Sequence, residues 1–356
     1  ELDHWDALQR MREYGLPIND ATQLCNSIEA VWTFIEHWES ARKKLSFEID
    51  GVVIKVNSRL QQQEMGFTSK FPRWAMSYKF ETERAESKLL SISYQVGRTG
   101  AVTPVANLEP MQLLGTTVKR ASLHNADFIA QLDVRVGDTV FVEKGGEIIP
   151  KIVEVDTSNR SDESVPTHFA SVCPECSTAL VREEGEAAYR CPNTMGCPPQ
   201  IKGRIEHFIG RKAMDVDSLG EGKIDVLYQA GLVRRVADLY QLDKEQILGL
   251  SKAIVNEATG DERIISFQEK TVDNILTGIA LSKSQPFEKV LFGLGIRFVG
   301  ETVAKKLAFH FKTMDAVMAA DFETLNAVSE IGGVIAKSVI DYFMITENRE
   351  EIELLK

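Results

Sequence analysis

Long apolar stretches are missing from the sequence. No segment approaches the roughly eighteen uninterrupted apolar residues of a membrane-spanning helix, and no signal-like segment opens the chain. We therefore expect a cytoplasmic protein that does not enter a membrane. The first residue is Glu1 rather than methionine, which suggests that upstream sequence is absent.

An excess of positive charge is also missing. The 356 residues carry a formal net charge of -11, with a pI near 5.2, whereas most nucleic-acid-binding domains have a basic surface. An acidic chain can still hold phosphates through a local basic patch or through backbone amides at helix N-termini. The hydrophobic content of 44% fits a soluble globular protein, and the length suffices for three or four modules.

Residues 46–55 (SFEIDGVVIK) form an apolar segment that ends in a lysine. The β-branched run after the Asp50-Gly51 turn signal predicts a buried strand that ends at Lys55. Burying a lysine costs free energy unless an anion meets it, and neither Glu48 nor Asp50 would lie on the face of Lys55 in a regular strand. The anion is therefore expected to be a ligand.

Residues 73–80 (RWAMSYKF) repeat this arrangement, with Lys79 on the face opposite to the alternating apolar residues. Two such strands would present Lys55 and Lys79 to one pocket. The alternative is that both are edge lysines whose ammonium groups extend into water, which is the more common outcome for either segment alone.

Residues 1–45 show the spacing of amphipathic helices. One helix is expected to stop at Gly15, and Asn19 or Asp20 to cap the next. Arg42 lies just ahead of the predicted strand. Most charged helix residues are solvated, so the position of Arg42 alone is weak evidence for a functional role.

Residues 81 to about 160 contain short apolar segments separated by glycine-containing turns, with a helical stretch around 125–132. The pattern predicts a five-stranded barrel of the OB type, a fold that binds nucleic acid across one face. The turn GRTG at 97–100 would bring Arg98 and Thr99 close to a phosphate, because its flanking glycines carry no side chain. A plain hairpin turn is the alternative.

Cysteine is scarce, and four of the five cysteines form two closely spaced pairs. The spacings C-x2-C and C-x5-C, joined by a polar loop, predict a closed tetrahedral zinc site. Disulfides are the alternative, but a reducing cytosol disfavours them. Four protein ligands leave no position for a catalytic water, so the zinc would be structural. The predicted ligands are Cys173, Cys176, Cys191 and Cys197, while Cys25 stands apart as a small buried residue.

Residues 201–356 contain an internal repeat. Four turns, three of them an apolar residue followed by glycine, each open a helix and align so that apolar helical positions coincide. This predicts four helix-hairpin-helix units, and ordinary hairpins of an α-bundle are the alternative. The amides at Gly220, Gly300 and Gly332 would face a DNA phosphate without reading bases. The second copy has Gln268 in place of glycine and is not expected to hold DNA in the same way. The aligned positions are Ile224, Val272, Ala304 and Ala336, and three residues further Leu227, Ile275, Leu307 and Val339.

In this order, the motifs resemble those of the NAD-dependent bacterial DNA ligases over the whole chain. ATP-dependent ligases share the lysine motifs and the barrel but not the zinc and hairpin modules. The segments DGVVIK (50–55) and WAMSYKF (74–80) look like the fourth and fifth nucleotidyltransferase motifs of the family. The segments VGRTGAVTPVA (96–106), SLHNADFI (122–129) and GGEIIPKI (145–152) resemble its OB domain.

The resemblance implies an enzyme that moves AMP from NAD to a lysine and then to the 5′-phosphate of a nick, before the 3′-hydroxyl displaces AMP. Lys55 and Lys79 would neutralise phosphoryl oxygens, and Arg42 and Asp50 would support phosphate or metal. Mg²⁺ would share that work, and one Zn²⁺ would be structural. The partner would be nicked duplex DNA of any sequence, and the protein a monomer associated with the bacterial nucleoid.

One departure from the family is decisive. Its nucleophile lies in a Lys-x-Asp-Gly motif, which this sequence lacks, because its one Asp-Gly pair at Asp50-Gly51 has Glu48 at the lysine position. The family's N-terminal nicotinamide-binding module and its BRCT module are also missing. We therefore expect an inactive portion of a ligase, and the alternative is a non-catalytic DNA-binding scaffold.

The expected architecture is multidomain α+β. Its four parts would be the C-terminal part of an adenylation (nucleotidyltransferase) domain at 1–80, an OB-fold domain at 81–165, a four-cysteine zinc finger at 166–200 and a helix-hairpin-helix α domain at 201–356.

Overall fold

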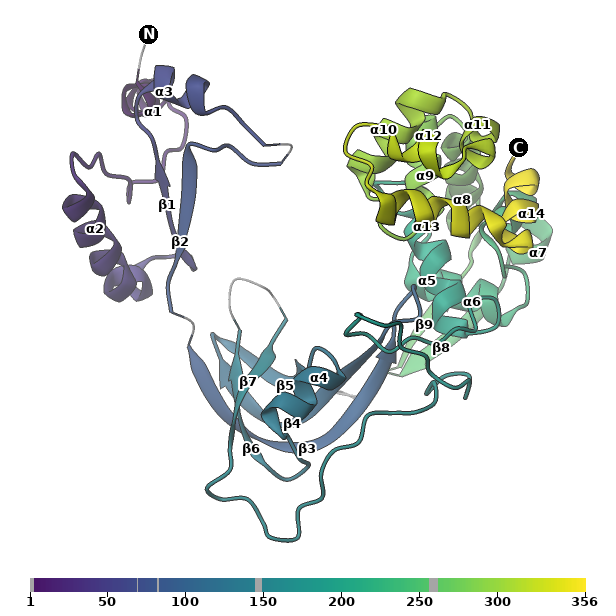
Figure 1. Cartoon of the computed structure of the whole chain (residues 1–356), viewed down its shortest axis with the longest axis horizontal. Helices are drawn as coiled ribbons and strands as arrows, with labels where there is room; N and C mark the ends of the chain where they lie inside the picture. The colour runs from purple at the N-terminus through teal and green to yellow at the C-terminus, as the bar shows by residue number, and fades with distance from the viewer. Residues whose placement is uncertain (1–2, 69, 82, 145–148, 256–261) are drawn as a thin grey trace. The chain divides into compact units, whose positions relative to one another are not determined.

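The computed structural model describes residues 3–68, 70–81, 83–144, 149–255 and 262–356 (Figure 1). The chain groups into two compact units. One comprises residues 1–91, 106–122 and 134–165, and the other comprises residues 92–105, 123–133 and 166–356. None of the described helices is long and apolar enough to cross a membrane.

The N-terminal module contains the two predicted helices and a two-stranded sheet. The first helix ends just before Gly15, whose φ of +78° costs glycine nothing. The predicted cap of the second helix is wrong. Ser27 caps it by accepting a hydrogen bond from the Ala30 amide, whereas the Asn19 side chain accepts from the Ala21 amide in a local turn. The elements are α1 (His4–Glu13), α2 (Ile28–Ala41), the 3-10 helix η1 (Arg42–Lys44), β1 (Gly51–Lys55), α3 (Arg59–Met65) and β2 (Ala75–Lys79).

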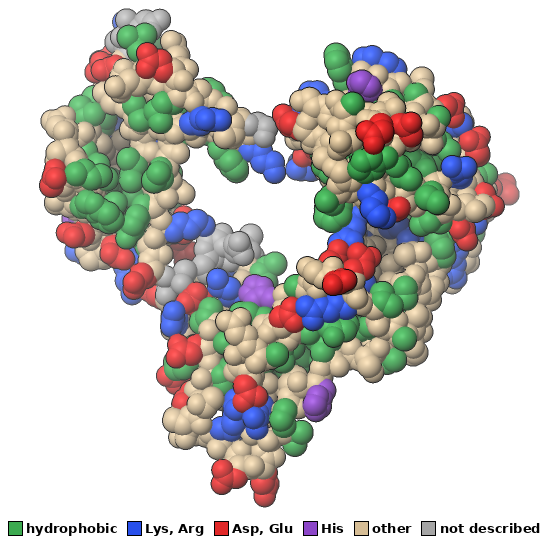
Figure 2. All heavy atoms as spheres, in the orientation of Figure 1, with side chains coloured by type: hydrophobic (Ala, Val, Ile, Leu, Met, Phe, Trp, Pro, Cys, Tyr) green, Lys and Arg blue, Asp and Glu red, His purple; other side chains and the backbone are tan. Residues whose placement is uncertain are grey.

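β1 and β2 pair antiparallel, and α2 lies on one face of their sheet. α2 packs on that face through Trp32, whose ring centroid lies 5.5 Å from that of Tyr78. Gly51 allows the strands to approach, because a Cβ there would lie 2.1 Å from the Tyr78 carbonyl oxygen. The expected burial of β1 is wrong, since Val53 on the other face is 60% exposed. Figure 2 shows apolar side chains gathered on the surface of this module.

Residues 84–156 contain a closed barrel with the strand order β3-β4-β5-β7-β6, which confirms the predicted OB-type fold. Alternate residues of β4 are buried, as in a strand with one face toward a core. Leu114 and Gly115 both have positive φ and form the tight turn into β5, a strand that the sequence did not predict. Residues 145–148, the first four of the segment GGEIIPKI, lie outside the described residues. The elements are β3 (Arg84–Val96), β4 (Val102–Leu113), β5 (Thr116–Ser122), α4 (Ala126–Leu132), β6 (Thr139–Glu143) and β7 (Lys151–Asp156).

The C-terminal half is helical and holds two apolar cores, one within residues 201–279 and the other within residues 291–352. The first core contains the second hairpin, which is interrupted by the strand pair β8 and β9. The elements are α5 (Pro198–Ile209), α6 (Glu221–Gln229), η2 (Val236–Gln241), α7 (Lys244–Ile247), β8 (Ser251–Val255), β9 (Glu262–Ser266), α8 (Glu269–Ser282), α9 (Phe287–Gly293), α10 (Glu301–Phe311), α11 (Met314–Ala319), α12 (Phe322–Asn326), α13 (Gly333–Met344) and α14 (Thr346–Leu355).

The helical repeat is confirmed by burial. In α6, α8, α10 and α13, the aligned residue of each helix has no exposed surface, and neither has the residue three positions further on. A residue that recurs fully buried at the same place in four helices is a core position. These residues are Ile224, Val272, Ala304 and Ala336, with Leu227, Ile275, Leu307 and Val339.

A buried ion pair supports the barrel. Asp138 accepts hydrogen bonds from Arg160 Nε at 3.0 Å and Nη2 at 2.8 Å, and its side chain is 1% exposed. The Arg135 amide donates to the same carboxylate at 2.7 Å. A carboxylate this deeply buried needs its charged partner, because its desolvation is otherwise uncompensated.

Arg160→Met should therefore destabilise the barrel by about 3 kcal/mol, since it leaves the Asp138 carboxylate without that partner. Arg84→Met is the control. It removes the pairs of a mostly exposed arginine with Glu143 and Glu154 and should cost less than about 1 kcal/mol. Native-state hydrogen exchange of the β6 and β7 amides measures both losses. Equal destabilisation by the two variants would contradict the role given to Asp138.

Candidate functional site

The open face of the β1–β2 sheet carries both predicted lysines. Gly51 pairs with Lys79 and Lys55 with Ala75, so the two lysines lie on one face but at opposite ends of the ladder. Four residues of strand separate them, about 13 Å. In the part of the chain that the structure describes, no carboxylate lies within 4.0 Å of Lys55 Nζ. The expected ligand anion for Lys55 stays a prediction.

Arg42 and Asp50 lie near the Lys79 end of the ladder. Lys79 Nζ is 3.4 Å from an Asp50 carboxylate oxygen, and both side chains are largely exposed, so water weakens this pair. The Arg42 guanidinium lies 5.1 Å from the Phe80 ring centroid and donates to the Glu81 carbonyl oxygen at 3.2 Å. The structure thus gathers Arg42, Asp50 and Lys79 at one end and places Lys55 at the other.

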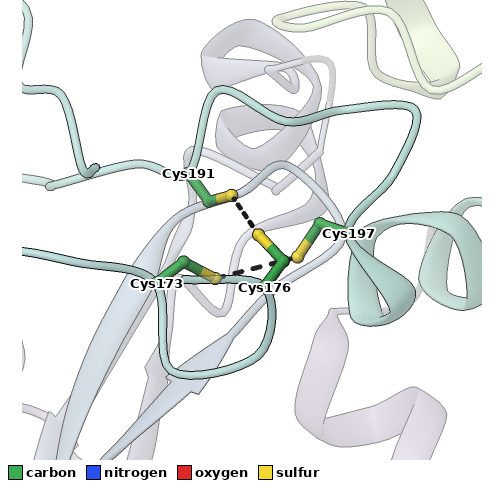
Figure 3. Close-up of side chains that lie close together, drawn as sticks. All are labelled: Cys173, Cys176, Cys191 and Cys197. Atoms are coloured by element: carbon green, nitrogen blue, oxygen red, sulfur yellow. Dashed lines mark hydrogen bonds between the residues drawn. The ribbon is translucent and has the colours of Figure 1, made fainter. Parts of the chain in front are cut away.

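The four predicted zinc ligands meet at one point (Figure 3). All four Sγ atoms lie within 4.8 Å of one another. The Cys173 and Cys197 sulfurs are 3.8 Å apart, and those of Cys176 and Cys191 are 3.4 Å apart. A tetrahedron with zinc–sulfur bonds of about 2.3 Å has edges of roughly 3.8 Å, while a disulfide bond is about 2 Å long. The thiols are free, and their spacing fits a zinc ion.

The local backbone explains this convergence. Ser177 follows the first cysteine pair at φ +58°, and its amide donates to the Cys173 carbonyl oxygen. Asn193 closes the second loop by accepting from the Gly196 amide at 2.9 Å. Cys197 is the N-cap residue of α5, so the fourth sulfur is placed by the start of that helix.

Burial and hydrogen bonding shift the thiol pKa values of this cluster in opposite directions. Burial raises the pKa of Cys191, and raises the pKa of Cys197 to about 11. Hydrogen bonding with Thr178 lowers the pKa of Cys176 to about 6. Bound zinc would deprotonate all four thiols, because a divalent cation reverses the effect of burial on a thiolate.

The turn at residues 97–100 is attached to this zinc module. Gly100 has φ +78°, and its carbonyl oxygen accepts from the Cys191 amide at 2.9 Å. A Cβ at Gly100 would lie 2.6 Å from the Cys191 carbonyl oxygen, so only glycine fits. The Thr99 carbonyl and hydroxyl oxygens both accept from Arg190 at 3.3 Å. Arg98 is exposed, and its Cβ lies close to α5, because a Cβ added at Gly203 would be 2.7 Å from it.

The hairpin glycines differ from the expectation. Gly220, Gly300 and Gly332 are the N-cap residues of α6, α10 and α13, with ordinary negative φ and open space where a Cβ would be. The Gly300 turn therefore does not require glycine for its backbone conformation. The left-handed residue lies two positions earlier in each hairpin. These residues are Ser218 (φ +62°), Phe298 (φ +64°) and Glu330 (φ +66°).

The second hairpin departs from the other three in its backbone. Gln268 is the N-cap residue of α8 at φ -82°. Two residues earlier, Ser266 ends strand β9 and is not left-handed. The predicted divergence of the second copy is therefore present in its conformation as well as in its sequence.

The hairpin helices leave their first amides without side-chain caps. Within the described chain, no side chain caps the N-termini of α6, α10 and α13, nor that of α8 in the second hairpin, whereas Thr313 and Asp321 cap the neighbouring α11 and α12. Uncapped N-terminal amides can donate hydrogen bonds to an external anion. The absence of a capping residue is a signal that sequence reasoning about glycine did not use.

Four segments of the chain match known domain families. Residues 2–83 match the NAD-dependent DNA ligase adenylation domain, and residues 86–164 match the NAD-dependent DNA ligase OB-fold domain. Residues 172–198 match the NAD-dependent DNA ligase C4 zinc finger domain, and residues 289–352 match a helix-hairpin-helix motif.

Curated relatives match the chain almost from end to end. A DNA ligase of Flavobacterium johnsoniae is 54% identical over 352 residues, covering 99% of this chain and 51% of that protein. A DNA ligase of Bacteroides fragilis is 52% identical over 353 residues, with the same coverage. The chain thus spans about half the length of these relatives. Adenylation, OB-fold and C4 zinc finger domains of NAD-dependent DNA ligases, followed by a helix-hairpin-helix motif, thus succeed one another along this chain, in agreement with the barrel, the four-thiol site and the hairpins.

Proposed function

We propose that this chain works as part of a DNA ligase that uses NAD to seal nicks in duplex DNA during replication and repair. The observation that carries the proposal is the succession, along one chain, of an open lysine face, a closed barrel, a four-thiol site and uncapped hairpin helices. No one of these features specifies ligation by itself. Relatives named DNA ligase align with the whole succession, but the activity of the complete protein remains part of the proposal.

The lysine face suits the transfer of a nucleotidyl group. Charge accumulates on phosphoryl oxygens in the transition state, and fixed cations stabilise it. Lys55 has no carboxylate partner within 4.0 Å among the described residues, and the Asp50 pair of Lys79 is exposed enough for a phosphate to compete with it. Lysine side chains are long and flexible, so both can reach a ligand bound over Val53 and Ser77, midway along the ladder.

NAD and magnesium enter as proposals for the complete protein. NAD would supply the AMP group, and Mg²⁺ would neutralise part of the phosphate charge. Asp50 supplies a carboxylate, and Arg42 a guanidinium, at the Lys79 end of the ladder. The chain contains no Lys-x-Asp-Gly motif, so the lysine that accepts AMP must come from elsewhere in the complete protein.

DNA binding is proposed to use backbone amides more than basic side chains. The uncapped N-termini of α6, α10 and α13 offer N–H groups to phosphates, and Arg98 lies in the turn at 97–100. Phosphate contacts of this kind do not read bases. The proposed partner is therefore nicked duplex DNA of any sequence, bound by a cytoplasmic, nucleoid-associated monomer.

A non-catalytic DNA-binding scaffold is the second candidate. The missing Lys-x-Asp-Gly motif favours it, and in that case the lysine face would be a relic. The gene sequence upstream of the first codon distinguishes the two. A Lys-x-Asp-Gly motif about 170 residues ahead of Lys55 would favour the enzyme, and its absence from the complete gene would favour the scaffold.

One zinc ion should bind tightly to each chain, because four thiols at these separations complete a tetrahedral site. Metal analysis of protein purified without chelator should give a ratio near one. Zinc affinity should fall as the pH is lowered, since binding displaces thiol protons. A ratio near zero with four thiols that react freely with a thiol reagent would contradict the site.

No covalent AMP adduct should form when this chain is incubated with NAD and magnesium, because it lacks the nucleophile motif. Intact-mass measurement before and after incubation is the test. AMP attached to Lys55 or Lys79 would overturn the assignment of these lysines to phosphate binding.

Gly300→Val should weaken binding to nicked DNA about tenfold, near 1.4 kcal/mol, by placing a side chain where a phosphate would approach. The fold itself has room for this Cβ, so circular dichroism should change little. Gln268→Val is the control at the N-cap of α8, which already carries a side chain, and it should change affinity much less.

Fluorescence anisotropy on nicked duplexes of unrelated sequence compares these two variants, and the affinity of each should fall steeply with salt. If both bind like the parent, or if Gln268→Val is the more damaging, the hairpins are packing elements and DNA contacts lie elsewhere.

A further inference from the structure

One carboxylate joins three parts of the second compact unit. Glu186, in the zinc module, accepts hydrogen bonds from Arg190 at 3.2 Å and from Arg297. Arg297 lies in the third hairpin, which we define as residues 294–300. Arg190 also donates to the carbonyl and hydroxyl oxygens of Thr99, in the turn at 97–100. Glu186 is thus connected, through one arginine on each side, to both proposed DNA-binding segments.

Glu186, Arg190 and Arg297 form a partly buried charge cluster, which we call the joint. The side chains of Glu186 and Arg190 are 23% and 20% exposed, so their attraction is screened less than that of a surface pair. Arg190 directly precedes the zinc ligand Cys191. On the hairpin side, the Arg297 carbonyl oxygen accepts from the Ser338 hydroxyl at 2.7 Å, which holds the hairpin to α13.

The third hairpin is distinct in this respect. Among the described residues, the hairpins that end at Gly220 and Gly332 make no ion pair with the zinc module. Glu330 of the fourth hairpin pairs with Lys306 of α10 instead, at 2.6 Å. Within the described chain, the third hairpin is therefore the only one that forms an ion pair with the zinc module.

We propose that Glu186 is a positioning residue for DNA binding, which holds the third hairpin and the turn at 97–100 in one rigid arrangement on the zinc module. The inference rests on the proposed function, since it assumes that the Gly300 amides and Arg98 contact phosphates. Two phosphate-binding segments held rigidly lose less conformational freedom on binding than two independent ones. Glu186 itself touches no DNA in this arrangement.

The sign of the charge change makes the proposal testable. Removing a negative charge from an acidic protein should strengthen its attraction to DNA if nothing else changes. Glu184, two residues away, is exposed and has no ion-pair or hydrogen-bond partner in the described chain. Glu184→Gln therefore measures the electrostatic effect alone, and Glu186→Gln adds the loss of the joint.

Dissociation constants are measured by fluorescence anisotropy on one nicked duplex over a series of salt concentrations, with the whole chain. Glu186→Gln should raise the dissociation constant by roughly 3- to 10-fold, whereas Glu184→Gln should leave it equal or lower. The slope of log affinity against log salt should become shallower by about one for Glu186→Gln, because one phosphate contact is lost. Zinc content must match the parent in both variants.

Arg297→Gln tests whether the effect passes through the third hairpin. Arg297→Gln also removes the Arg297 pair with Glu183 at 3.5 Å, whereas Glu186→Gln also removes the pair with Arg190. The losses of affinity should therefore add up only in part in the double variant, because the Glu186–Arg297 link is common to both changes. Hydrogen exchange should accelerate at the amides of residues 298–302 in Glu186→Gln but not in Glu184→Gln.

The proposal is overturned if Glu186→Gln binds as tightly as Glu184→Gln or more tightly. Tighter binding would show that Glu186 screens Arg297 from DNA rather than positioning it. If the parent chain fails to bind nicked DNA at all, the proposed function fails instead. If DNA binding fails in this way, hydrogen exchange still tests the contacts of Glu186. Unchanged exchange at residues 298–302 in Glu186→Gln would show that Glu186 does not hold the third hairpin, and accelerated exchange would show that it does so within the fold.

Discussion

The four thiols that lie close together determine the positions of neighbouring elements as well as the geometry of the metal site. The backbone of Cys191 makes two hydrogen bonds that lead away from the cluster. Its amide donates to the Gly100 carbonyl oxygen at 2.9 Å, and its carbonyl oxygen accepts from the buried Gln200 side chain at 3.0 Å. One bond leads to a barrel turn and the other to α5. Whatever gathers the sulfurs therefore also places the barrel turn against the first helix of the hairpin domain.

The acidic composition is compatible with phosphate binding by backbone amides, and many of the basic side chains are already paired with carboxylates. Lys202 and Lys252 both contact Asp225, at 2.7 and 2.5 Å, and Lys212 pairs with Glu301 at 2.9 Å at the start of α10. Side chains used in this way contribute little net positive field. Uncapped backbone amides carry partial positive charge without altering the formal count. A net charge of -11 is thus a weak guide to whether phosphates can bind.

Sequence reasoning succeeded where a local pattern determines the structure. The buried helical positions were predicted because packing repeats at fixed steps, and the thiol cluster because cysteine spacing limits the geometries available to the chain. It failed where the outcome depends on distant neighbours. The burial of β1 depends on which faces of the sheet other segments cover, and the exposed Val53 shows that one face stays open. The joint at Glu186 connects residues more than a hundred positions apart, and no spacing rule reveals it.

Three of the hairpins place the left-handed residue and the N-cap glycine at different positions. Left-handed backbone occurs two residues earlier, at Ser218, Phe298 and Glu330, where a side chain makes it cost on the order of 1 kcal/mol. The glycine itself has an ordinary conformation and contributes only the absence of a side chain over the first amides. The second hairpin has neither feature, because Ser266 stays in a strand and the N-cap residue of α8 is Gln268 rather than glycine. It incurs no such strain, and a side chain is present at the helix start where the other three copies have none.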